Sequence, residues 1–312
     1  MALFVVLFIS GLLSLGGAFE DNCREMRLRD FSVGSRQEIA CRDSRREQVL
    51  YCTDSDRIIF DDYVKQVKPS KSLPVSDLII VTAQFFINRP YVASTLEFEP
   101  EGLVVNLREF DCTTFVETVL ALAGTIKKYN NPSFDDFCGQ LRQIRYREGV
   151  INDYTDRLHY FSDWIYENEQ KGIVRDVTGD AGGEPYKVHV DYMSAHPEYY
   201  RRIKSNPGYV ATLREKEREI SARNGYSFIP ESAITTCERA VKDGDIVCFV
   251  TGIKGLDVAH LGFVYRNAGQ FTFIHASSSA MKVIVNPQSV DVYVEKSKQN
   301  KGIMVVRPLD AD

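Results

Sequence analysis

The hydrophobic pattern of this chain changes period once, and this change constrains the fold more than any other feature. Before residue 225, the periodic segments repeat apolar side chains every three to four residues, which is typical of helices. From Asp243 to Pro308 the period becomes two and β-branched residues are frequent, which predicts a run of antiparallel strands. Helices first and strands last, without alternation, indicate the α+β class rather than a doubly wound sheet.

The composition is that of an ordinary folded chain. Its 312 residues are 44% hydrophobic and 26% charged, which excludes a disordered, collagen-like or coiled-coil protein. The formal net charge is −5, so no basic excess points to nucleic acid, and we expect no nucleic-acid partner.

The N-terminus carries an apolar segment of the kind that directs export. The run from Ala2 to Leu15 is shorter than the roughly 20 residues of a membrane span and ends in Gly16, Gly17 and Ala18. This predicts a signal peptide over residues 1–18, followed by a polar extension over 19–57. The alternative is a buried N-terminal core helix. No later stretch is apolar enough to span a bilayer, so we expect no stable membrane anchor once the leader is cleaved.

The chain has seven cysteines, and export would permit disulfides among them. Cys41 and Cys52 lie in an Arg-rich polar stretch and are candidates for a bridge, as are Cys237 and Cys248 on either side of a loop. A reduced, buried thiol is the alternative in each case. Sequence alone does not decide the connectivity, so the partner of Cys23 and the partner of Cys138 also stay open.

Several helices are predicted ahead of the strands. Residues 58–88 have helical spacing, interrupted at Leu73-Pro74, and residues 102–107 form a short extended segment. A second helix begins after Asp111, a good N-cap, and ends near Lys128, and a third covers the segment DDFCGQLRQIRYR. Residues 149–207 are polar and aromatic without a clear period, which indicates loops, short elements and a binding surface.

Cys112 is the sharpest candidate for chemistry. It falls in the first turn of the helix that Asp111 caps, where the helix dipole and free backbone N–H groups favour a thiolate. The same N–H groups can stabilise a developing oxyanion. The alternative is a small buried side chain in a helix.

A nucleophilic cysteine needs a base, and the chain has five histidines. If the predicted hairpin turns between Asn267 and Ala268, His260 and His275 lie directly opposite each other, with Cβ atoms about 4.5–5.5 Å apart. A slip of one residue would place them on opposite faces. His260 could then take the proton of Cys112 while His275 holds its ring. The alternatives are two structural sheet histidines, or a metal site made of the three side chains.

These residues lie in motifs that resemble a known family. FDCTTFVE, DGDIVCF, HLGFVY and FIHASS occur in the order seen in NlpC-type papain-like cell-wall hydrolases. The segments YREGVINDYTDRLHYFSDWIYEN, GLDVAHLGF and GIMVVRP are more closely similar to the N-acetylmuramoyl-L-alanine amidase-like subfamily. The resemblance covers roughly residues 58–308.

The resemblance implies a papain-like NlpC-type core, with a nucleophile helix packed on an antiparallel sheet and additional helices and loops. It implies a cysteine amidase domain over residues 58–312, with Cys112 as nucleophile, His260 as general base and His275 as the third, polar member. The substrates would be peptidoglycan fragments, with anhydro-muropeptides expected among them, and the bond would be the amide between N-acetylmuramic acid and L-alanine. No cofactor or metal is implied, and the location would be the periplasm, with secretion as the alternative.

Other functions are compatible with parts of the same pattern. Thr113 and Thr114 replace the Ser-Gly that usually follows the nucleophile, which separates this chain from most relatives. A D-glutamyl stem-peptide endopeptidase is the alternative within the same fold. A non-catalytic muropeptide-binding domain is a second, although the intact set of Cys and two His argues against it. A zinc hydrolase is a third.

Candidate substrate contacts lie near the aromatic stretch. We expect Arg157 to pair with a substrate carboxylate and Trp164 to stack on a sugar, with a core position as the alternative for Trp164. Further candidates are His159 and Tyr160 in the same stretch, Asp111 beside the nucleophile, and the loop residue Asp257.

Overall fold

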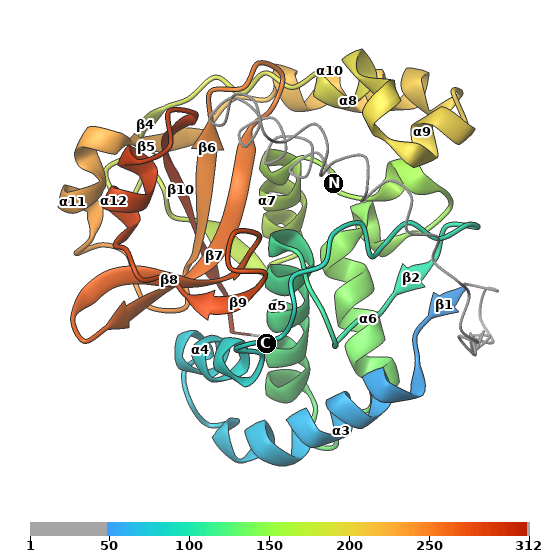
Figure 1. The fold of residues 1–312 in the computed structure, drawn as a ribbon, viewed down its shortest axis with the longest axis vertical. Coiled ribbons are helices and arrows are strands. Elements are labelled where there is room, and N and C mark those ends of the chain that lie inside the picture. The colour runs from blue at the N-terminus through green and yellow to red at the C-terminus, as the bar shows by residue number, and fades with distance from the viewer. Residues whose placement is uncertain (1–48, 311–312) are drawn as a thin grey trace, which may run out of the picture.

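The computed structural model describes residues 49–310, which form helices packed around one large antiparallel sheet (Figure 1). The sheet has the strand order β4-β5-β10-β6-β7-β8-β9, and β3 also pairs with β10. Every strand pairing in it is antiparallel, as the period-two segments predict. The strands are β3 Val174–Asp176, β4 Glu184–Pro185, β5 Ser227–Pro230, β6 Ile246–Thr251, β7 Val258–Asn267, β8 Gln270–Ser277, β9 Lys282–Val285 and β10 Asn300–Pro308.

The helices precede most of the sheet in the chain, which confirms the mixed helix and antiparallel-sheet class. A small parallel pair, β1 Leu50–Tyr51 with β2 Leu103–Val104, lies outside the large sheet. The α-helices are α3 Asp54–Val67, α4 Val75–Phe85, α5 Cys112–Lys128, α6 Phe134–Arg145, α7 Phe161–Gln170, α8 Tyr192–Ala195, α9 Arg201–Ser205, α10 Tyr209–Ala222, α11 Ile234–Cys237 and α12 Val290–Glu295. Short 3-10 turns occupy Lys68–Ser70, Arg147–Gly149, Tyr154–Asp156, Pro197–Tyr199 and Glu231–Ala233.

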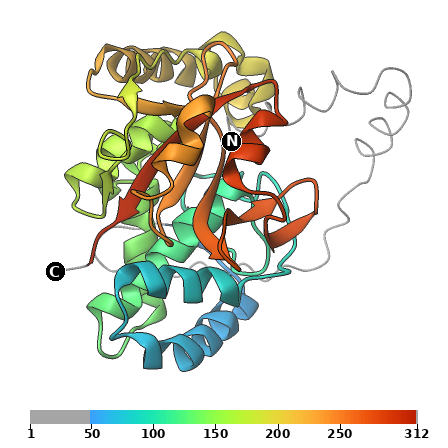
Figure 2. The same cartoon turned by 90° about the vertical axis from the view of Figure 1, so that its left-hand side faces the viewer.

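Helix α5 lies between the sheet and α6, at the centre of the molecule (Figure 1). Its apolar residues are buried on nearly every side, because α4, α6, β7 and β8 all contact it. The opposite face of the sheet has a second apolar core, over which α11 and α12 lie (Figure 2). The sheet is therefore buried on both faces, and the start of α5 lies beside its central strands.

The hairpin register differs from the prediction. Val264 pairs with Phe273 and Asn267 with Gln270, so the turn residues are Ala268 and Gly269, one position later than expected. Both have positive φ, 50° and 85°, as a two-residue primed turn requires, and glycine adopts this conformation without strain. Moving the turn by one residue shifts the pairing by two, which keeps His260 and His275 on the same face.

Three other expectations need correction. Residues 149–207 contain the ten-residue helix α7, which the aromatic pattern concealed. Helix α3 begins at Asp54, ahead of Ile58, because Thr53 and Asp56 form a capping box. Cys237 and Cys248 do not pair with each other, since their side chains belong to the cores on opposite faces of the sheet.

Some predictions concern residues outside the described range. The leader, Cys23 and Cys41 lie there, so the Cys41–Cys52 bridge stays a prediction. Within residues 49–310, no helix combines the length and the hydropathy needed to cross a bilayer.

Candidate active site

Cys112 occupies the first position of α5, as the sequence predicts. Asp111 caps the helix: its Oδ1 accepts hydrogen bonds from the backbone N–H of Thr114 at 2.8 Å and from the Thr114 hydroxyl at 2.9 Å. The Thr114 hydroxyl oxygen in turn accepts from the Asp111 N–H at 2.9 Å. This reciprocal cap holds the backbone on both sides of Cys112.

Burial controls the ionisation of the thiol. Cys112 is only 2% exposed, and burial, reinforced by the Asp111 carboxylate, raises its pKa to about 12. Contacts with the Thr113 side chain and the Leu261 backbone oppose this rise. The expectation of a thiolate at the helix start is therefore wrong here, because desolvation by burial favours the neutral thiol. The thiol needs a base to remove its proton.

His260 and His275 form a close pair on adjacent strands. His260 Nε2 lies 2.5 Å from His275 Nδ1, with ring centroids 4.8 Å apart and ring planes at 82°. Continuing the observed register places Gly262, not His260, across from His275, so the two rings meet on a diagonal. A Cβ at Gly262 would lie 3.1 Å from His275 Cβ, so glycine leaves room for this imidazole.

Aromatic side chains surround the pair. Phe249, Phe273 and Tyr293 contact it; the Tyr293 ring centroid is 6.0 Å from His260 and 6.2 Å from His275. Burial lowers the pKa of His260 to about 4 and, together with the neighbouring His260, lowers the pKa of His275 well below its usual value. Both imidazoles are neutral at pH 7. We call these five side chains the histidine face.

Two interactions relate Cys112 to the histidine face and its neighbouring backbone. The backbone of Leu261, next to His260, interacts with the sulfur and favours its ionised form. The charge of an ionised Cys112 also raises the pKa of Tyr293, after the larger effect of burial. Sequence reasoning missed Tyr293, because it lies on the short helix α12 and only the fold brings it over β7 and β8.

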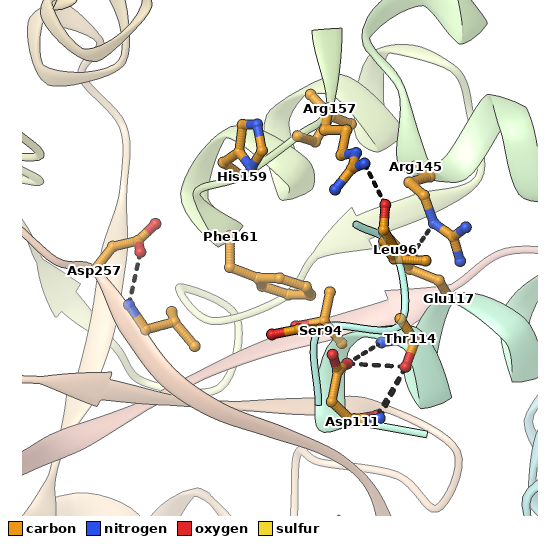
Figure 3. A pocket seen from close by; sticks show the side chains of 13 residues that line it. Ser94, Leu96, Asp111, Thr114, Glu117, Arg145, Arg157, His159, Phe161 and Asp257 are labelled. Carbon is orange, nitrogen blue, oxygen red and sulfur yellow. Dashed lines mark hydrogen bonds and ion pairs between the residues drawn. The ribbon is translucent and has the colours of Figure 1, made fainter. Parts of the chain in front are cut away.

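A pocket lies next to Cys112 in the structure, lined by its sequence neighbours Asp111 and Thr113. Most of its lining residues are polar or charged (Figure 3), and we call it the polar pocket. Thr113 and Thr114 line it from the start of α5, and Phe161 reaches it from the start of α7. Four of the predicted substrate residues line it together, although they come from distant parts of the sequence: Asp111, Arg157, His159 and Asp257.

Arg157 is already neutralised by the protein itself. Its guanidinium donates to Glu101 at 2.6 Å, to Glu97 at 3.0 Å and to the Leu96 carbonyl at 2.6 Å. Burial opposes ionisation, but the electrostatic effects of Tyr146, Glu101 and Glu97 together raise the pKa of Arg157. The carboxylates that Arg157 meets are internal, so its observed role is to join the pocket wall to the segment around Leu96.

His159 and Asp257 keep polar atoms at the pocket. His159 Nε2 donates to the Tyr154 carbonyl at 2.9 Å, which leaves Nδ1 as an acceptor, and burial lowers its pKa well below the usual value. The Asp257 carboxylate accepts from the backbone N–H groups of Ser162 at 2.7 Å and Val258 at 2.8 Å. Burial nevertheless raises the pKa of Asp257.

Tyr160 and Trp164 do not line this pocket. The Tyr160 hydroxyl donates to Glu217 at 2.7 Å and accepts from the Met193 N–H at 2.9 Å. Trp164 is 0% exposed and stacks on Phe161, with ring centroids 4.5 Å apart. The expected stacking of Trp164 on a sugar is wrong, because no surface of its ring is accessible; Phe161 is the aromatic residue at the pocket.

Sequence reasoning also missed a buried ion pair in the pocket wall. Arg145 Nε lies 2.6 Å from Glu117 Oε2, and Arg145 also donates to the Val104 carbonyl at 2.7 Å. Burial raises the pKa of Glu117, and Arg145 opposes this rise. The available signal was a single carboxylate on an otherwise apolar helix, which requires a buried partner.

Among residues 49–310, no group of three or more His, Cys, Asp or Glu side chains could hold a metal ion.

Comparison with known proteins gives a consistent result. The family described as N-acetylmuramoyl-L-alanine amidase-like matches residues 81–303. A crystal structure of an N-acetylmuramoyl-L-alanine amidase from Bacteroides uniformis is 34% identical, with a TM-score of 0.70 over 75% of this chain and 99% of its own. No curated protein matches significantly.

Two further solved structures share the fold. A Bacteroides fragilis protein, named as a candidate xylanase, is 36% identical, with a TM-score of 0.69 over 73% of this chain and 99% of its own. A DUF1460 protein from Legionella pneumophila is 21% identical, with a TM-score of 0.62 over 82% of this chain and 93% of its own. At that identity the likeness concerns the fold alone.

Proposed function

The chain belongs to the N-acetylmuramoyl-L-alanine amidase-like family, and we propose that it is an exported cysteine amidase with a papain-like core. It hydrolyses the amide between N-acetylmuramic acid and L-alanine in peptidoglycan fragments, with anhydro-muropeptides as preferred substrates. It acts in the periplasm, where such fragments are met. The observation that carries this proposal is the thiol of Cys112 at a capped helix start, on a helix that packs against β7 and β8, the two strands that bear His260 and His275.

The ionisation states support general-base catalysis. Cys112 is a neutral thiol and His260 a neutral imidazole at pH 7. His260 Nε2 is engaged with His275, so Nδ1 is the nitrogen that takes the proton as Sγ attacks the lactyl carbonyl carbon. Proton transfer and attack are coupled, since a thiolate is not formed in advance.

The remaining steps return the protein to its starting state. As the C–N bond breaks, protonated His260 donates its proton to the leaving amine of L-alanine, and a thioester joins Cys112 to the lactyl group. His260 then removes a proton from water as the water oxygen attacks the thioester carbonyl. The C–S bond breaks, protonated His260 returns the proton to the Cys112 sulfur, and the muramyl acid leaves and ionises in solution.

The polar pocket supports binding of the groups next to this amide. Asp111, Asp257 and His159 Nδ1 are acceptors, which suit substrate N–H and O–H donors. Phe161 adds an apolar surface for a sugar ring or a methyl group.

The test is a mass-resolved digest of anhydro-muropeptides and the matching reducing-end muropeptides by the chain from Phe19 onward. We expect release of intact stem peptide with a free L-alanine amine, faster from the anhydro form and unchanged by a chelator. Cys112→Ala should abolish it. Cys138→Ala is the matched control, because this thiol lies on α6, away from the polar pocket and the histidine face.

Other products would replace the proposal with a specific alternative. Cleavage inside the stem peptide would indicate the D-glutamyl endopeptidase. Binding without cleavage of either substrate would indicate a muropeptide-binding domain.

A further inference from the structure

A third polar side chain continues the line formed by His260 and His275. On β9, Ile284 pairs with His275, and Asn286 lies two residues further along, which places it on the same face as His275. The Asn286 N–H donates to the Phe273 carbonyl at 2.8 Å, so the pairing extends to this residue. His260 on β7, His275 on β8 and Asn286 at the end of β9 therefore form a diagonal row across three neighbouring strands.

The Asn286 amide has a defined orientation. Asn286 is 6% exposed, and its Nδ2 donates to the Gln288 carbonyl at 2.8 Å. Because a carbonyl can only accept, the NH₂ group must face Gln288, which leaves Oδ1 for another donor. The Thr272 hydroxyl also contacts the carbonyls of Asn286 and Gln288, at 2.8 and 2.7 Å, and fixes this segment to β8.

The proposed mechanism dictates where the protons lie on the two imidazoles. For His260 Nδ1 to act as a base, the His260 proton must be on Nε2 and be donated to His275 Nδ1. A neutral His275 then carries its own proton on Nε2. This nitrogen is buried, and among the described residues the structure gives it no hydrogen-bond partner. Asn286 is the side chain that interacts with His275 and favours its protonated form, as an acceptor does.

We propose that Asn286 is a positioning residue: its Oδ1 accepts the proton of His275 Nε2 and thereby keeps His260 in the tautomer that has Nδ1 free. Without this acceptor, no hydrogen bond favours the proton on His275 Nε2, so the tautomer in which His275 Nδ1 donates to His260 Nε2 becomes more populated. His260 then holds its proton on Nδ1 and cannot act as a base. The inference rests on the proposed cysteine mechanism, and it adds a fourth member to the Cys112, His260 and His275 set.

The test compares Asn286→Leu, which removes the acceptor at similar volume, with Asn286→Asp, which keeps an acceptor oxygen. Loss of a residue that acts through another typically costs about 10- to 100-fold in activity. We expect Asn286→Leu to lower kcat by this factor with KM unchanged, and Asn286→Asp to retain most of the wild-type kcat. Equal loss in both variants, or a rise in KM alone, would overturn the proposal.

A second measurement does not depend on activity. Nitrogen-15 NMR of the histidine-labelled full chain reports the tautomer of each imidazole, and can be recorded in a Cys112→Ala background. We expect His275 as the Nε2–H tautomer when Asn286 is present and an increased Nδ1–H population in Asn286→Leu. An unchanged tautomer in Asn286→Leu overturns the role of Asn286. Failure of the amidase itself would instead show as an inactive wild-type protein with the tautomers as expected.

Discussion

The two sides of Cys112 are built in different ways. The histidine face comes from one stretch of sequence, β6 to α12, and is largely buried and aromatic. The polar pocket is assembled from segments far apart in sequence, and ion pairs such as Glu117–Arg145 and Glu101–Arg157 hold its wall. Strand register positions the first side, and long-range charge contacts position the second.

The difference shows how burial can serve two purposes. On the histidine face, burial lowers the pKa of both imidazoles and keeps a base available at neutral pH. In the polar pocket, burial raises the pKa of Glu117 and Asp257, and an arginine or backbone N–H groups oppose it. Removing a side chain from the histidine face should therefore lower the catalytic rate, whereas removing one from the wall of the polar pocket should lower the free energy of unfolding.

The largest effect should come from removing the base. We expect His260→Ala to lower kcat at least about 10³-fold, because loss of one member of a catalytic set removes most of its contribution. The His260→Ala variant should still be folded, so that the loss of activity is not a loss of structure. The rate of stem-peptide release measures this effect. His189→Ala is the matched control, since this histidine is exposed and its Nε2 lies 3.3 Å from the exposed carboxylate of Asp191. A His260→Ala variant with a tenth of wild-type activity would contradict the assignment.

On the pocket side, the largest effect should be on stability. Arg145→Met leaves the Glu117 carboxylate buried without its partner, and breaking such a pair costs about 3–5 kcal/mol. Urea unfolding measures the loss. The double variant Arg145→Met/Glu117→Leu should recover most of it, because no unpaired charge remains. Arg218→Met, which breaks an exposed pair with Glu215, should change the free energy of unfolding by less than about 1 kcal/mol. A comparable loss in both single variants would refute the contrast.

Sequence reasoning performed well where the structural cause is local. The cap at Asp111 and the first-turn position of Cys112 depend on neighbouring residues and are confirmed. Alternation along the strands placed His260 and His275 on one face, and this is also confirmed. The register itself was wrong by two residues, because it depends on whether Gly269 occupies the second turn position.

The failures concern contacts between distant segments. The carboxylates that neutralise Arg157 lie 56 and 60 residues away in sequence, so no local pattern identifies them. The burial of Trp164 depends on how α7 packs in the core, and the high pKa of Cys112 depends on what covers the start of α5. Local signals predicted which residues gather near Cys112, but not which of them the protein has already paired.

The low pKa of His260 also makes stability depend on pH. The pKa falls from 6.5 in a model peptide to about 4 in the folded protein, so only the unfolded chain binds a proton between these values. Stability is therefore full above pH 6.5 and falls as pH falls toward 4. At pH 5 the loss relative to pH 7 is about 2 kcal/mol for this one group.

The pH effect can be isolated with a variant. Urea unfolding of wild type and His260→Gln at pH 7 and pH 5 measures it, and the variant should lose less stability on acidification by about 2 kcal/mol. Comparing the two proteins cancels the contributions of Glu117 and Asp257, whose raised pKa values act in the opposite direction. The contribution of His275 is reduced in the variant as well, because His260 helps to lower its pKa, and this adds to the difference in the same direction. Equal pH dependence in both proteins would show that His260 titrates normally in the folded state.

The smallest effect separates the two stacked aromatic residues, Phe161 and Trp164. Trp164→Phe reduces a fully buried ring, so we expect a stability loss of about 1–3 kcal/mol with KM unchanged. Phe161→Leu removes aromatic surface at the pocket, so we expect KM to rise with a smaller loss of stability. Muropeptide kinetics and urea unfolding of both variants distinguish the roles. The opposite result, with KM raised in Trp164→Phe but not in Phe161→Leu, would mean that substrate reaches further into the core than the polar pocket does. The division between a buried histidine face and a polar pocket would then no longer describe the site.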